Sequence, residues 1–170
     1  APIRSTVVND IHDQVLKGRA LLDQNDAQSV TVLRAAAQAS LSALAKVANC
    51  DPLSLTAGSL PGDVLTVGTA QTAAEAHLYW GRAADHFAQR DEAITALCRS
   101  VRFAQAIPTN DTATTYLRRD SSLDLGRVLR DGLPLIAPDD TLDAIATFLA
   151  HDRKVTIPIA QRHRAQDAGA

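Results

Sequence analysis

The chain has 170 residues and a formal net charge of -2, and 46% of its residues are hydrophobic although only 4% are aromatic. A chain of this length can bury roughly 70% of its unfolded surface and so form one domain with a core. Its apolar content comes mainly from alanine, leucine and valine, which favours packed helices over a β-sandwich. Acidic and basic residues are mixed along the sequence, so we expect no basic surface for nucleic acid or anionic lipid.

These observations predict a single all-α domain over residues 1–160, followed by a flexible tail at 161–170. No stretch of roughly 18 residues is uninterrupted by polar side chains, so we expect no membrane insertion. The chain has no methionine and opens with Ala1-Pro2, as a protein does after removal of a signal peptide. We therefore expect an extracytoplasmic protein, periplasmic or secreted, with an internal domain of a longer intracellular protein as the alternative.

A first hairpin is expected over residues 4–48. Helical spacing of apolar residues predicts a helix over 4–24 and a second helix that ends near Ala48, separated by the turn residues Gln24-Asn25-Asp26. Cys50 follows the second helix, and Cys98 lies in a later one. In an oxidising compartment these two cysteines could form a disulfide, whereas the alternative is two small buried thiols.

Proline and glycine residues mark residues 50–68 as a long loop. Such a loop is either functional or a structural cover, and we favour a cover because it carries leucines and valines at Leu53, Leu55, Leu60, Val64 and Leu65. Thr72-Ala-Ala-Glu75 reads as a capping box, which predicts that the third helix runs from about residue 73 to 88. A fourth helix is expected from near Asp91 toward Pro108, completing a second hairpin over 72–107.

The remaining helices are expected to form a third hairpin over residues 111–151. Thr109-Asn110-Asp111 can cap a fifth helix, which Ser121 would restart and Gly132 would end. Pro138-Asp139-Asp140 opens a sixth helix, and the β-branched run at 155–159 predicts an extended segment after it.

The segment from Ala74 to Ile107 carries a recognisable pattern. Gly81, Ala93 and Ser100 are small residues at positions where two antiparallel helices must approach closely, and the segment resembles a tetratricopeptide (TPR) repeat. The resemblance implies an array of antiparallel hairpins, an α-α superhelix of about six helices, and the class of protein-binding scaffolds. Gly18-Arg19-Ala20 and Gly81-Arg82-Ala83 also echo each other, which hints at a diverged repeat.

The search for catalytic chemistry finds no matching motif. H-E-x-x-H, G-x-S-x-G, a Walker loop and G-x-G-x-x-G are all missing from the sequence. None of the five histidines stands four residues from another histidine or from a cysteine, as a helical metal pair would require. We therefore expect a non-enzymatic protein without metal or cofactor.

In proteins similar to the TPR repeat, stacked hairpins form a groove that binds an extended peptide or a partner helix. Here the groove contacts are expected on the exposed side of the third helix, at Tyr79, Arg82 and His86. His77 and Trp80 form a second stripe on this helix, which lines a groove or, as we favour, fills the seam between hairpins. The alternative function is a helical enzyme or small-ligand sensor whose pocket lies between the 50–68 loop and helix 73–88, around His77, Trp80 and Asp63.

Overall fold

The computed structural model describes residues 5–132, and within this range the chain is helical and contains no strand. The elements are α1 Thr6–Asp23, α2 Gln28–Ala48, the short 3-10 turn η1 Pro52–Ser54, α3 Val64–His86, α4 Arg90–Ala106 and α5 Thr112–Gly132. The prediction of an all-α fold is confirmed. The expected sixth helix, the extended run at 155–159 and the tail at 161–170 lie outside the described residues.

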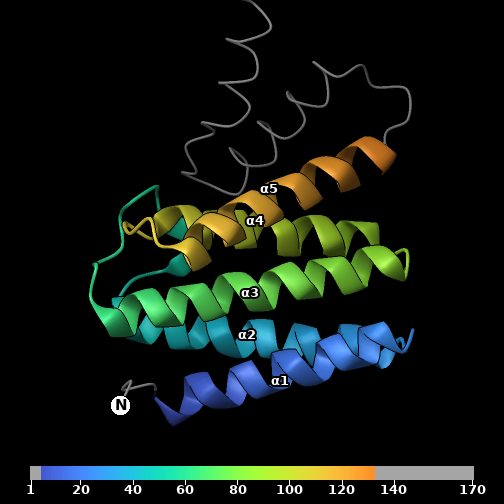
Figure 1. The fold of residues 1–170 in the computed structure, drawn as a ribbon, viewed down its shortest axis with the longest axis horizontal. Helices are drawn as coiled ribbons and strands as arrows, with labels where there is room; N and C mark the ends of the chain where they lie inside the picture. The colour runs from blue at the N-terminus through green and yellow to red at the C-terminus, as the bar shows by residue number, and fades with distance from the viewer. Residues whose placement is uncertain (1–4, 133–170) are drawn as a thin grey trace, which may run out of the picture.

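The helices pack as two layers. Figure 1 shows α1, α3 and α5 in front and α2 and α4 behind them, with successive helices running in opposite directions. Each pair α1–α2 and α3–α4 is therefore an antiparallel hairpin, as predicted. None of the helices within residues 5–132 has both the length and the apolarity needed to cross a bilayer.

The first hairpin begins and ends close to the predicted residues because its signals are local. The Ser5 side chain accepts a hydrogen bond from the Val8 backbone N–H at 3.3 Å and so caps α1. Ile11 and Val15 are buried on one face of α1 at helical spacing. Gly18 lies where α1 meets α2, since a Cβ atom there would stand 2.6 Å from the Leu33 side chain.

The predicted start of the third helix was wrong. α3 begins at Val64, where the Asp63 carboxylate accepts a hydrogen bond from the Thr66 N–H at 3.0 Å. Thr72 is no cap, because it lies within the helix and its hydroxyl donates to the Gly68 carbonyl at 3.0 Å. The helix is capped at Asp63 rather than at Thr72 because the two additional turns between them bury Val67 and continue the helical apolar pattern.

The segment between α2 and α3 covers the core, as favoured from the sequence, but Val64 and Leu65, which were expected to take part, lie in the first turn of α3 and are exposed. Leu55 and Leu60 are buried in the core cluster formed with α3 and α4. The backbone N–H groups of Gly58 and Leu60 donate to the last carbonyls of α4, at Gln105 (2.8 Å) and Ala106 (3.0 Å). The cover therefore satisfies carbonyl groups that a helix end leaves without intrahelical partners.

The second hairpin packs through the small residues that carry the TPR resemblance. A Cβ atom on Gly81 would lie 2.6 Å from Cγ of Leu97, and the buried Ser100 hydroxyl donates to the Ala74 carbonyl at 2.7 Å. Both hairpins thus set a glycine of the first helix against a leucine of the second.

α5 is one continuous helix, which corrects the predicted restart at Ser121. The Asp111 carboxylate caps it by accepting from the Thr114 N–H at 2.8 Å. The Ser121 hydroxyl donates to the Leu117 carbonyl at 2.7 Å, an arrangement that a serine adopts inside a helix.

Candidate functional site

The layer formed by α1, α3 and α5 carries two hollows that follow one another along α3. The first, of about 690 Å³, is lined by His12 and Arg19 of α1, Glu75 and Tyr79 of α3 and Tyr116 of α5, among others, and is called the aromatic hollow below. The second, of about 480 Å³, is lined by Leu22 of α1 and by residues of α3 and α5 around Gly81, and is called the Gly81 hollow. The two hollows together are called the groove below.

The aromatic hollow combines exposed aromatic surface with arginine side chains. The guanidinium carbon of Arg19 lies 4.2 Å from the centre of the Tyr79 ring, and one of its nitrogens is 3.8 Å from a Glu75 carboxylate oxygen. Tyr116 faces this hollow from α5 and is 48% exposed. Cation–π stacking holds Arg19 and Tyr79 in place while leaving their outer surfaces available to a ligand.

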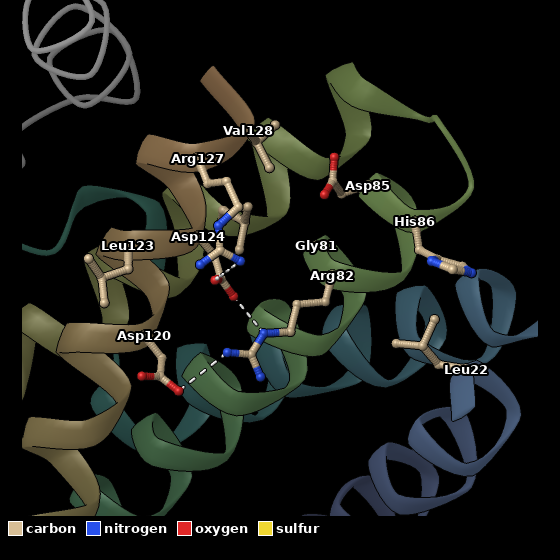
Figure 2. Close-up of a pocket in the computed structure, with 11 residues that line it drawn as sticks. Leu22, Gly81, Arg82, Asp85, His86, Asp120, Leu123, Asp124, Arg127 and Val128 are labelled. Atoms are coloured by element: carbon tan, nitrogen blue, oxygen red, sulfur yellow. Dashed lines mark hydrogen bonds and ion pairs between the residues drawn. The ribbon is translucent and has the colours of Figure 1, made fainter. Parts of the chain in front are cut away.

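Arg82 of α3 separates the two hollows. Its Nε donates to Asp124 at 2.5 Å and a second nitrogen lies 3.3 Å from Asp120, so the side chain bridges to two carboxylates of α5 (Figure 2). Burial is the largest single effect on Arg82 and lowers its pKa, but the hydrogen bond and the charge of Asp124, together with Tyr79 and Asp120, raise the pKa by more in sum and keep it above the ordinary value of an arginine. This bridge fixes the position of α5 relative to α3 and so preforms the groove.

Asp120 is held ionised within the same network. Burial would raise its pKa, but hydrogen bonds from Tyr116, Arg119 and Arg82 hold that pKa below the ordinary value of an aspartate. Tyr116 is therefore oriented by a carboxylate of its own helix, and its ring stays at the edge of the aromatic hollow.

The structure brings three of the predicted site residues to the groove. Tyr79 lines the aromatic hollow, and Arg82 and His86 line the Gly81 hollow. His86 is exposed, and its Nε2 lies 2.6 Å from the Asn25 side-chain oxygen.

The other two predicted site residues lie in the core. His77 is fully buried, with its ring edge-on to Trp80 at 5.8 Å and to Phe103 at 5.0 Å between ring centres. The indole N–H of Trp80 donates to Glu92 at 2.7 Å, and Arg34 donates to the same oxygen. Both side chains are therefore buried: Trp80 is linked through Glu92 to Arg34 of the first hairpin, whereas the ring contacts of His77 lie within α3 and α4.

The pocket expected around His77, Trp80 and Asp63 does not bring these residues together. Asp63 caps the start of α3, and 14 residues of helix correspond to roughly 21 Å between it and His77. A Thr66 hydrogen bond lowers the Asp63 pKa, which is the ordinary consequence of capping a helix.

Several groove residues were missed from the sequence. Arg19, Glu75, Asp85, Tyr116 and Asp124 come from three helices, and only the packing of α1 and α5 against α3 shows that they share a surface. The sequence held one indication of these residues, the similarity of Gly18-Arg19 to Gly81-Arg82. The two arginines of this repeated pattern both approach the Tyr79 ring. Within residues 5–132, no group of three metal-ligating side chains lies close enough to hold an ion.

The sequence left open whether Cys50 and Cys98 form a disulfide or are two buried thiols; the structure does not join them, and only one of the two is buried. Cys50 is exposed and Cys98 is buried. We expect a thiol-alkylating reagent to modify Cys50 in the folded protein and Cys98 only after unfolding, because thiol reactivity requires access of the reagent. Intact mass after native and denaturing alkylation, both without reductant, measures this. A denatured protein that takes up no alkyl group would show instead that the two cysteines are joined in solution.

Comparisons with models of protein families, with curated proteins and with solved structures found no match to this chain. What the groove does must therefore be argued from its own shape and chemistry.

Proposed function

We propose that this chain is a non-enzymatic interaction module of TPR-like architecture whose groove binds an extended peptide or a partner helix. The observation that carries the proposal is the pair of hollows, about 690 and 480 Å³, aligned along α3 and lined by α1, α3 and α5, with Leu97 of α4 in the second hollow. We further propose an extracytoplasmic location, periplasmic or secreted, for this activity.

The dimensions of the groove suit such a ligand. From Gly68 to His86 the groove follows 19 residues of α3, whose first and last are roughly 27 Å apart along the helix axis. An extended peptide of about eight residues spans that distance, since each residue covers roughly 3.3–3.6 Å.

The side chains in the groove are of the kinds that dominate binding energy in protein interfaces. Tyrosine and arginine are enriched at such hot spots because they bury large surfaces and still offer polar contacts. Tyr79 and Tyr116 lie on facing helices, and Arg19 already stacks on one of them. The Arg82 bridge already orders these side chains in the free protein, so binding of a ligand costs less conformational entropy.

The test is a selection of short random peptides displayed on phage against the purified chain. We expect the selected peptides to lose at least about tenfold in affinity when Tyr79→Ala and Tyr116→Ala are combined, because each change removes a large aromatic contact. Fluorescence anisotropy with a labelled peptide measures Kd. Leu16→Ala is the control, since it also removes an exposed apolar side chain of α1 but at a position outside both hollows. Equal affinity for the wild-type chain and the double tyrosine variant would contradict the proposal.

A further inference from the structure

The Gly81 hollow has an apolar rim on two sides and a carboxylate at its end. Leu22 of α1 and Leu123 of α5 stand on opposite sides of it, and Leu123 is 59% exposed (Figure 2). Asp85 of α3 projects at the end of the same hollow, beyond the Arg82 bridge. The fold leaves Leu123 exposed to water. A ligand that covers Leu123 would therefore gain free energy from the removal of this apolar surface from water.

Asp85 occupies an electrostatically unfavourable position. It is the second-last residue of α3, where the unpaired carbonyl groups give the helix its negative end. An ionised carboxylate there is repelled by the helix itself. No ion pair within the described range, residues 5–132, offers Asp85 a compensating cation.

The other charges of the hollow leave it with an acidic balance. Asp120 and Asp124 are engaged by Arg82, and Arg127 adds a looser contact at 3.6 Å to Asp124. Among the residues that line the hollow, three carboxylates including Asp85 therefore face two guanidinium groups, and the end of α3 adds further negative potential; Arg119, which pairs with Asp120 at 3.2 Å, lies outside this lining. Charge complementarity thus favours a cationic group in this hollow.

Resting on the proposed function, we propose that the Gly81 hollow receives a lysine or arginine side chain of the bound peptide. The aliphatic stem of that side chain lies between Leu22 and Leu123, and its charged end lies beside the Asp85 carboxylate. Lysine and arginine suit this arrangement because they bury their methylene groups on apolar surface while the charge stays at the solvent-facing end.

The experiment uses the same phage-displayed random peptides and adds Asp85→Asn. We expect peptides selected on the wild-type chain to be enriched in lysine and arginine. Replacement of the peptide's basic residue by methionine should weaken binding about fivefold, as loss of a partly exposed ion pair does. On the Asp85→Asn chain the same replacement should change Kd little. Asp13→Asn is the matched control, because it removes an equal charge from an exposed position on α1.

The variant is also expected to melt at a higher temperature than the wild-type chain, because it removes a carboxylate from the negative end of α3. Weaker binding by a more stable protein would exclude misfolding as the cause. Peptides that bind through Tyr79 and Tyr116 but show no preference for basic residues would overturn this inference and leave the proposed function standing. Failure to select any peptide that depends on those tyrosines would overturn both.

Discussion

Gly81→Ala is expected to lower the free energy of unfolding by about 1–2 kcal/mol, as overpacking a filled core does. A methyl group at this position would stand 2.6 Å from Cγ and 2.8 Å from Cδ2 of Leu97, far inside van der Waals contact. Leu97 is only 1% exposed, and although it borders the Gly81 hollow, its side chain would have to leave its packed position to admit the methyl group. The clash therefore outweighs the gain of about 1 kcal/mol that alanine brings to a helix interior.

Gly68→Ala is the matched control, because it makes the same change in the same helix at a site where the new Cβ meets nothing within 4 Å. This variant should raise the free energy of unfolding by about 0.5–1 kcal/mol through helix propensity alone. Urea unfolding followed by Trp80 fluorescence measures both, since Trp80 is the one tryptophan and is buried. A Gly81→Ala chain as stable as the Gly68→Ala chain would refute the close contact between α3 and α4.

Those two glycines also show how far sequence could predict this fold. Gly81 was identified as a close-contact residue because it forms, with Ala93 and Ser100, the pattern of small residues on which the TPR resemblance rests. Gly68 was instead interpreted as the end of a loop, although it lies inside α3. A glycine without a packing partner carries no local sign of its helical state, and Asp63 was not identified as a cap from the sequence, whereas Thr72 was. Burial of Val67 decided between them, and burial is a tertiary property.

The groove was harder to predict than the helices for a related reason. Tyr79 and Trp80 are adjacent in sequence, yet Tyr79 is half-buried and lines the aromatic hollow whereas Trp80 is buried, because successive helical residues point about 100° apart. α3 has aromatic residues on both faces, so hydrophobic periodicity alone could not say which face is covered. That assignment depends on α1 and α5, whose contacts with α3 join residues as far apart as Arg19 and Tyr79.

The second large expected effect is a loss of stability in mild acid that depends on His77. Burial is the main cause that lowers the His77 pKa from 6.5 to about 3, and the charge of Arg99 adds to it, whereas the hydrogen bond to the Ala73 carbonyl opposes it. Because that carbonyl can only accept, Nδ1 carries the proton of the neutral ring. Nε2 is buried and has no hydrogen-bond partner among the described residues, so a second proton would be placed in the core without compensation.

The sign of the effect follows from the two pKa values. Between pH 6.5 and about 3 the unfolded chain binds a proton at His77 that the folded chain does not, so stability falls as the pH falls through this window. At about pH 5 the expected loss is about 2 kcal/mol relative to neutral pH, since each pH unit below 6.5 costs 1.36 kcal/mol. The carboxylates that are hydrogen-bonded in the fold, such as Glu92, titrate below their ordinary pKa of 4.5 and contribute little at that pH.

His77→Phe should abolish this acid sensitivity while preserving the fold. Phenylalanine keeps an aromatic ring against Trp80 and Phe103 and removes the unpaired Nε2, so stability at neutral pH should stay within about 1 kcal/mol of wild type. Urea unfolding at about pH 7 and pH 5 gives the difference for each chain, and His12→Gln serves as the control for a histidine near the surface. We expect wild type and His12→Gln to lose about 2 kcal/mol more than His77→Phe between the two pH values. Parallel pH profiles for all three chains would show that His77 is hydrated or protonated in the folded protein, which would contradict its burial between α3 and α4.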